Sequence, residues 1–161
     1  MTVVYLDNNA TTQVAPEVFE EMAPYFSSLY GNPSSMHSFG GQVGRTLAQA
    51  RDRVASLLGC QASEILFTSC GTEGDSTAIR SALEAQPEKR HVVTTKVEHP
   101  AVLNLVNHLV KKGYHVTLLS VDGQGRLDPE ELRASLRDDT ALVSVMYANN
   151  ETGTVFPLPE I

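Results

Sequence analysis

One stretch of the chain decides the fold: Phe67-Thr68-Ser69-Cys70-Gly71-Thr72-Glu73. It ends a short apolar run, Ile65–Thr68, that is typical of a strand, and it opens Thr72–Leu83, whose apolar residues have helical spacing. Such a turn can bind an anion, because a helix start offers unpaired backbone N–H groups and the positive end of the dipole. We expect Thr72 to be the N-cap and, with Gly71, to hold a phosphate. An ordinary helix start, with Thr72 and Asp75 as a capping pair, is the alternative.

The composition is that of one globular domain with a core. The chain has 161 residues, of which 42% are hydrophobic and 19% charged. Its formal net charge of -7 argues against a nucleic-acid or anionic-membrane partner, since both require a basic face. No apolar run approaches the length of a membrane span, and the N-terminus lacks the features of a signal peptide. We therefore predict a cytoplasmic protein.

The two cysteines, Cys60 and Cys70, suggest neither a disulfide framework nor a zinc site, because they lack CxxC spacing and a His partner at ligand spacing. We predict no metal site and expect both cysteines to be small buried or half-buried residues. At Cys70 a helix N-terminus could lower the pKa of the thiol.

Two helices are predicted before the phosphate turn. The first begins at Pro16, which suits a first helical position, and Pro24 is expected to kink it. Turn residues follow at Gly31–His37, and a long apolar stripe through Leu57 then marks a helix that Gly59 ends.

From Ile65 onward strands and helices alternate, which predicts an α/β fold with a largely parallel sheet flanked by helices. The expected helices are Pro100–Lys112 and a helix that runs from a capping box at Asp128 to Leu136. The expected strands are Ile65–Thr68, Val92–Thr95, Val116–Val121 and Ala141–Met146.

Polar residues follow three of the predicted strands. They are Ser69–Thr72 after the first strand, Glu98 and His99 after the second, and Ala148–Glu151 after the fourth. Ligands of parallel α/β sheets bind at the carboxyl ends of the strands. We expect these three segments to converge on one site.

Together with the N-terminal loop, these segments resemble the cysteine desulfurases, which are pyridoxal-phosphate enzymes. The resemblance runs the whole length of the chain, and Thr-Ser-Cys-Gly-Thr-Glu is most similar to the NifS branch that serves nitrogenase. The motifs that carry it are Tyr5–Thr12, Gly31–His37, Thr68–Glu73, Glu98-His99-Pro100 and Ala148–Gly153.

The resemblance implies roles for four residues. Gly71 and Thr72 would bind the cofactor phosphate. His99 would stack on the pyridine ring and is a candidate catalytic residue for proton transfer; alone, it would be a helix-entry residue. Asn150 would reach the cofactor and substrate side of the pocket, with a turn-forming Asn-Asn pair as the alternative.

Other polar residues carry weaker predictions. For a first group, loop capping and a position lining the pocket are equally good explanations: Asn8, Asn9, His37 and Glu151. A second group of histidines is predicted to be structural: His91, His108 and His115.

The implied fold is fold type I of the PLP-dependent transferases. Residues 1–161 would form the N-terminal segment and part of the PLP-binding large domain, so that the rest of this incomplete large domain and a C-terminal small domain lie beyond Ile161. The lysine that holds the cofactor, the carboxylate that pairs with its ring nitrogen and the cysteine that accepts sulfur would lie there too. None of the chain's lysines stands in the family's Ser-x-His-Lys setting: Lys89, Lys96, Lys111 and Lys112.

The implied activity removes sulfur from L-cysteine, giving L-alanine and an enzyme persulfide. The sulfur would pass to an iron–sulfur scaffold protein, in nitrogen fixation for nitrogenase metalloclusters, and the full-length enzyme would be a homodimer. The alternatives are a selenocysteine lyase or small aminotransferase of the same fold, a non-catalytic module, and a generic nucleotide-binding domain. The last is disfavoured because Gly71 stands outside any Gly-x-Gly-x-x-Gly or Gly-x-x-x-x-Gly-Lys pattern.

Overall fold

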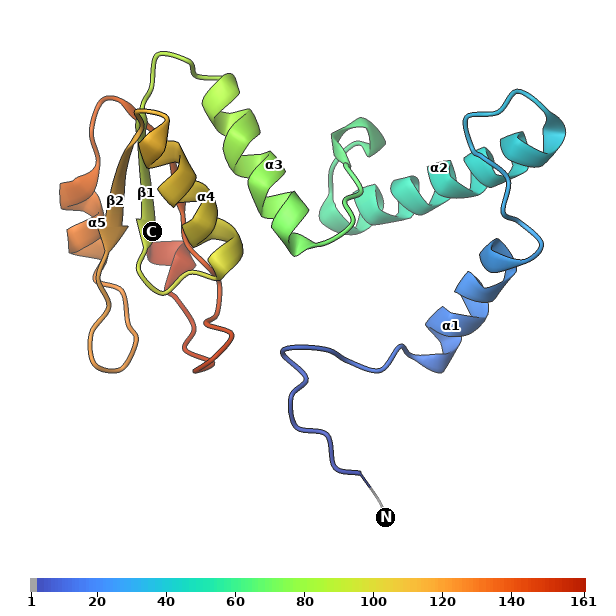
Figure 1. Cartoon of the computed structure of the whole chain (residues 1–161), viewed down its shortest axis with the longest axis horizontal. Coiled ribbons are helices and arrows are strands. Elements are labelled where there is room, and N and C mark those ends of the chain that lie inside the picture. Colours follow the sequence, from blue (N-terminus) through green and yellow to red (C-terminus); the bar gives the residue numbers. More distant parts are fainter. Residues whose placement is uncertain (1–2) are drawn as a thin grey trace. The chain divides into compact units, whose positions relative to one another are not determined.

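The chain divides into two compact units, Met1–Phe67 and Thr68–Ile161, in a computed structural model that describes residues 3–161 (Figure 1). Within those residues, no helix combines the length and apolar character that crossing a bilayer requires.

The first helix of the first unit, α1, is short. It spans Pro16–Met22 and continues as a 3-10 helix, η1, over Ala23–Phe26. Pro24 lies in η1, where its missing N–H and its ring prevent the α-helical hydrogen bond from continuing. The helix expected to kink at Pro24 therefore changes from α-helical to 3-10 geometry just before this proline.

The long second helix, α2, spans Ser38–Leu58 as predicted. His37 is its N-cap, and the His37 Nδ1 atom accepts a hydrogen bond from the Gly40 amide at 3.1 Å. Gly40 must be glycine, because a Cβ atom there would lie 2.4 Å from the backbone oxygen of Asn32. Gly59 ends the helix with a left-handed φ of 71°, which glycine adopts without strain.

The strand predicted at Ile65–Thr68 is wrong. A 3-10 helix, η2 (Ala62–Glu64), precedes it, and Ile65 is extended (φ −91°, ψ 123°), but no strand forms. An extended segment becomes a strand only when a neighbour supplies ladder hydrogen bonds. Instead the Arg51 side chain donates to the Ile65 carbonyl, and its guanidinium lies 4.7 Å from the centre of the Phe67 ring.

The second unit is built on a parallel sheet of three strands among the described residues, in the order β2-β1-β3. These strands span His91–Thr95 (β1), His115–Leu119 (β2) and Thr140–Ser144 (β3). They confirm the three predicted strands within two residues at each end. All five residues of β1 are buried, as expected for a central strand covered on both faces.

Helices cover both faces of this sheet (Figure 1). Val92 packs in a core with residues of α3 (Gly71–Glu84) and α4 (Pro100–Lys111). Its neighbour Val93 points to the other face, where the core contains Leu132 of α5 (Pro129–Ser135) and Phe156. The chain ends in a short 3-10 helix, η3 (Leu158–Glu160).

Only half of the predicted capping box at α5 forms. Asp128 is the N-cap and accepts a hydrogen bond from the Glu130 amide at 2.9 Å. Glu131, the expected reciprocal partner, accepts instead from the Ser120 amide at 3.2 Å. Glu131 therefore links the helix to the end of β2.

His91 ties the three strands together through its side chain. Nδ1 lies 2.8 Å from Thr140 Oγ1 on β3, and Nε2 lies 2.8 Å from Thr117 Oγ1 on β2. The residue is fully buried. Burial lowers the pKa of His91, and the positive charge of Arg137 lowers it further.

We predict that protonation of His91 destabilises the fold as the pH falls. The folded-state pKa of His91 lies below the ordinary 6.5. The contribution of the neutral imidazole to the free energy of unfolding is therefore complete above pH 6.5 and is lost as the pH falls below it. The loss amounts to at most about 1.4 kcal/mol per pH unit. Chemical denaturation of the wild type and His91→Gln between pH 7.5 and 5 measures it. Identical pH slopes in the two proteins would contradict the prediction.

We also predict that Phe156 anchors the core beneath α5. It is 2% exposed, so Phe156→Ala should lower the free energy of unfolding by about 3–5 kcal/mol. Phe156→Leu keeps most of the buried volume and should cost less than about 1.5 kcal/mol. Urea titration of both variants tests this order, and equal losses would show that cavity formation is not the cause.

Candidate functional site

The candidate site lies at the carboxyl edge of the sheet in the second unit. The strands point toward the end at which α3 and α4 begin (Figure 1). Residues 96–99 follow β1 at this edge, and residues 145–151 follow β3, which pairs directly with β1. Two loops and two helix starts therefore share one side of the sheet, as parallel topology requires.

At the start of α3, the predicted N-cap is wrong by two residues. Cys70 is the N-cap, so Gly71 and Thr72 are the first two residues of the helix. The helix begins early because Glu73 reaches back: its Oε2 atom accepts from both the Ser69 amide and the Ser69 hydroxyl at 2.6 Å. Among residues 3–161, a Cβ atom on Gly71 would meet nothing within 4 Å, and no side chain makes an N-cap hydrogen bond. The helix start thus has open space and first-turn amides.

Cys70 is exposed, so the expectation that it is buried or half-buried is wrong, whereas Cys60 is half-buried as expected. The pKa of the Cys70 thiol is lowered, chiefly by the backbone amide of Glu73 and then by the Ser69 hydroxyl. This agrees with the effect expected at a helix start. No set of three His, Cys, Asp or Glu side chains in residues 3–161 is placed to share a metal ion.

His99 is the N-cap of α4. Its Nδ1 atom accepts a hydrogen bond from the Ala101 amide at 3.1 Å, and the side chain is exposed at the carboxyl edge. The predicted helix-entry position is therefore correct. Because Nδ1 accepts, the neutral ring carries its proton on Nε2. That leaves Nε2 as the nitrogen that can exchange a proton with a ligand.

The loop after β3 is organised by Asn149. Asn149 Oδ1 accepts from the amides of Glu151 and Thr152 at 3.0 and 2.9 Å. Asn149 Nδ2 donates to the carbonyl of Val97 at 3.1 Å, which joins this loop to the loop after β1. Asn150 follows, and its Nδ2 atom donates to Glu151 Oε1 at 2.9 Å. The structure therefore brings the segments of His99 and Asn150 together.

Glu98 forms a second link between the same loops. Its Oε1 atom accepts from the Met146 amide at 2.7 Å and lies 3.4 Å from the Thr95 hydroxyl. The residue is only 6% exposed. Burial raises the pKa of Glu98 above its ordinary range, against the effect of these two hydrogen bonds.

The remaining predicted residues lie elsewhere or at the margin. Asn8, Asn9 and His37 belong to the first unit, where His37 caps α2. His108 is exposed on α4, and His115 is exposed at the start of β2.

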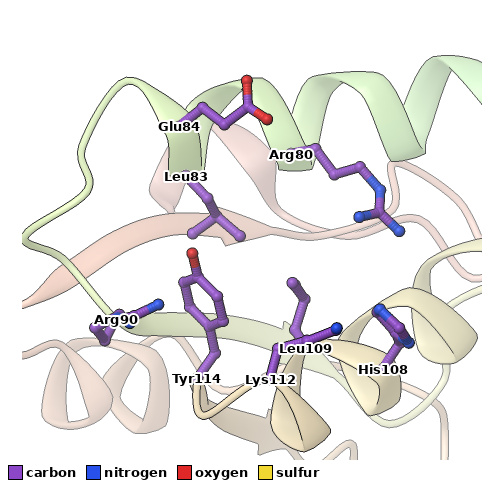
Figure 2. Close-up of a pocket in the computed structure, with 8 residues that line it drawn as sticks. All are labelled: Arg80, Leu83, Glu84, Arg90, His108, Leu109, Lys112 and Tyr114. Atoms are coloured by element: carbon purple, nitrogen blue, oxygen red, sulfur yellow. The ribbon is translucent and has the colours of Figure 1, made fainter.

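A separate pocket of about 360 Å³ lies at the opposite, amino end of the sheet (Figure 2). It is formed where α3 and α4 end and where the chain enters β1 and β2. None of the predicted site residues contributes to it. Its lining residues are Arg80, Leu83, Glu84, Arg90, His108, Leu109, Lys112 and Tyr114.

Comparison with known proteins identifies the family. The model of the family described as aminotransferase class-V matches residues 4–161. The chain belongs to the class-V aminotransferase family. Enzymes of this family depend on pyridoxal phosphate, and the predicted resemblance to cysteine desulfurases is confirmed.

Relatives in this family match the whole chain. It is 66% identical over 161 residues to a cysteine desulfurase of Trichormus azollae and 60% identical over 162 residues to the cysteine desulfurase NifS of Azotobacter vinelandii. All of this chain is covered, but only 40% of each relative. The chain thus spans about two fifths of the length of these curated relatives.

Solved structures of the family confirm the predicted α/β fold. A NifS-like protein superposes with a TM-score of 0.91 at 44% identity, covering 96% of this chain and 43% of that one. A structure described as SspA in complex with cysteine has a TM-score of 0.90 at 35% identity, covering 98% and 46%.

Sequence reasoning assigned no role to two residues that organise this edge. The sequence places Glu98 after a strand without specifying its burial, and it marks Asn149 only as part of a turn. A signal existed for Glu98, because a carboxylate that directly follows a central parallel strand lies where the core ends. For Asn149 no such signal existed, because the sequence alone does not distinguish its role from that of the adjacent Asn150.

We predict that Cys70 reacts faster with iodoacetamide than Cys60, because it is exposed and the pKa of its thiol is lowered. At pH 7 the Cys70 peptide should be alkylated several-fold sooner, as peptide mass spectrometry would measure. Cys70→Ser removes that fast site and leaves the rate at Cys60 unchanged. Faster labelling of Cys60 in the wild type would contradict the prediction.

Proposed function

We propose that the protein to which this chain belongs is a cysteine desulfurase that removes sulfur from L-cysteine, giving L-alanine and an enzyme persulfide. The observation that carries the proposal is the shared carboxyl edge, at which the His99 and Asn150 loops are joined and α3 begins. The 66% identity to a cysteine desulfurase over the whole chain supports it.

The residues at the start of α3 fit the phosphate of pyridoxal phosphate. Gly71 leaves the first turn open, and no side chain of the described part of the chain makes an N-cap hydrogen bond there. The positive end of a helix of 14 residues favours a dianion. The Gly71 and Thr72 amides and the Thr72 hydroxyl would hold the phosphate. When bound, the cofactor supplies an electron sink next to the substrate's α-carbon.

His99 is suited to proton transfer at this edge. Its Nδ1 atom is held by the Ala101 amide, so the ring orientation is fixed while Nε2 stays accessible. A histidine with one nitrogen anchored can accept or donate a proton at the other near neutral pH. We propose His99 as a catalytic residue that also stacks on the cofactor ring.

Asn150 would act as an uncharged donor. Its side-chain amide is half-buried beside Glu151, on a loop fixed by Asn149. An amide N–H in this position can donate to a phenolic or carboxylate oxygen without adding charge to the site. This supports its proposed contact with the cofactor and substrate.

The proposal also includes the partners that the resemblance implies. The persulfide sulfur would pass to a scaffold protein for iron–sulfur cluster assembly, for nitrogenase in the NifS branch. The name NifS on a relative of 60% identity supports that branch. The enzyme would be a cytoplasmic homodimer.

We predict that His99→Gln lowers kcat for L-alanine formation from L-cysteine by roughly 10²–10⁴-fold, the usual contribution of a general acid or base. The assay uses the full polypeptide loaded with pyridoxal phosphate, together with a thiol reductant that releases the persulfide sulfur as sulfide, and it measures L-alanine and sulfide. His108→Gln is the matched control, because His108 is an exposed histidine of α4. Full activity of His99→Gln would remove His99 from the mechanism, and a wild type that forms no L-alanine would refute the proposed function.

A further inference from the structure

Glu98 is a carboxylate that the fold takes out of water without a cation. It is 6% exposed, and no ion pair to it is found among residues 3–161. Acidic side chains are rarely buried unless they are paired, because the lost hydration is costly. Its compensation consists of hydrogen bonds to Oε1 from the Met146 amide at 2.7 Å and the Thr95 hydroxyl at 3.4 Å.

The shorter of these hydrogen bonds, from the Met146 amide to Glu98, connects two loops rather than stabilising one. Met146 lies in the segment that runs from β3 to Asn150, and Glu98 directly precedes His99. Among residues 3–161, one further hydrogen bond between a side chain and the backbone crosses these loops: Asn149 Nδ2 donates to the Val97 carbonyl. Asn149 also bonds within its own turn, so it shapes the turn as well as docking it. Glu98 has no such local role in the turn.

We propose that Glu98 is a positioning residue: by holding the Met146 amide, it fixes the loop that carries Asn150 against the loop that carries His99. This inference rests on the proposed function for its consequence at the cofactor, but the link between the loops stands on the hydrogen bond itself. The role requires a side-chain oxygen that can accept a hydrogen bond from the Met146 amide at this distance.

The charge of Glu98 is not needed for this role. Burial raises the pKa of Glu98, and the negative charge of Asp75 on α3 raises it further. The groups that oppose this are the Met146 amide and the Thr95 hydroxyl. Since a neutral amide oxygen can accept the same hydrogen bond, glutamine should replace glutamate here, whereas alanine and the shorter aspartate should not.

The test compares Glu98→Gln, Glu98→Asp and Glu98→Ala in the full polypeptide. Hydrogen exchange of the Met146 amide in the apo protein reads the hydrogen bond directly. It should speed up by roughly tenfold in Glu98→Ala and Glu98→Asp and stay within about twofold in Glu98→Gln. Titration with pyridoxal 5'-phosphate, followed by absorbance, should show its dissociation constant rising by about tenfold in the same two variants only.

Leu109→Ala is the matched control for general destabilisation. Leu109 is 5% exposed on α4 and packs in the core on the other face of the sheet, beside the pocket at the amino end. Its truncation should lower the midpoint of thermal unfolding without changing Met146 exchange or cofactor affinity. If Glu98→Ala does not fold, Glu98→Asp against Glu98→Gln carries the comparison.

Three outcomes would overturn the proposal: wild-type Met146 exchange in both the aspartate and alanine variants, equal losses in the glutamine variant, or the same changes in Leu109→Ala. Failure of the proposed function is a separate result. It would appear as a wild type that makes no L-alanine, while the exchange of Met146 would still report whether Glu98 holds the loop.

Discussion

The burial of β1 between two parallel neighbours is the constraint on which the second unit depends. Parallel strands cannot be joined by a tight turn, so the chain must cross over through a helix each time. The crossover from β1 to β2 runs through α4, which therefore begins where β1 ends. Polar loops and helix N-termini are thereby gathered at one edge, while the strands that carry them remain in an apolar core. The candidate site is a consequence of this connectivity.

Much of this architecture could be predicted because it depends on patterns within short segments. β1 contains two valines followed by two threonines, and these β-branched residues favour a strand. Ile65–Thr68 has the same kind of pattern but forms no strand, because strand formation depends on a partner that the pattern does not reveal. The N-cap of α3 was misplaced for a similar reason: the return of Glu73 to Ser69 is a contact, and composition does not determine it.

At the site, the positions of the residues were easier to predict than their roles in the hydrogen-bond network. Residues after parallel strands must lie at the carboxyl edge, so His99 and Asn150 could be placed from spacing alone. The sequence could not distinguish Asn149 from Asn150, although Asn149 organises the turn and Asn150 Nδ2 donates to Glu151. The place of Glu98 after a central strand favours burial, but glutamate is normally exposed, so residue type and position predict opposite environments.

The contacts of His91 with both neighbouring strands also bear on how the chain avoids misfolding. Strands of similar apolar sequence can pair in several registers, and a shift of two residues keeps every side chain on its original face. Such a shift of β2 would put His115 or Leu119 where Thr117 now meets the imidazole. With Leu119 there, a buried ring nitrogen would have no hydrogen-bond partner. The histidine therefore makes one alignment of the sheet distinctly better than its nearest competitors, and a polar residue in the core serves as a check on assembly.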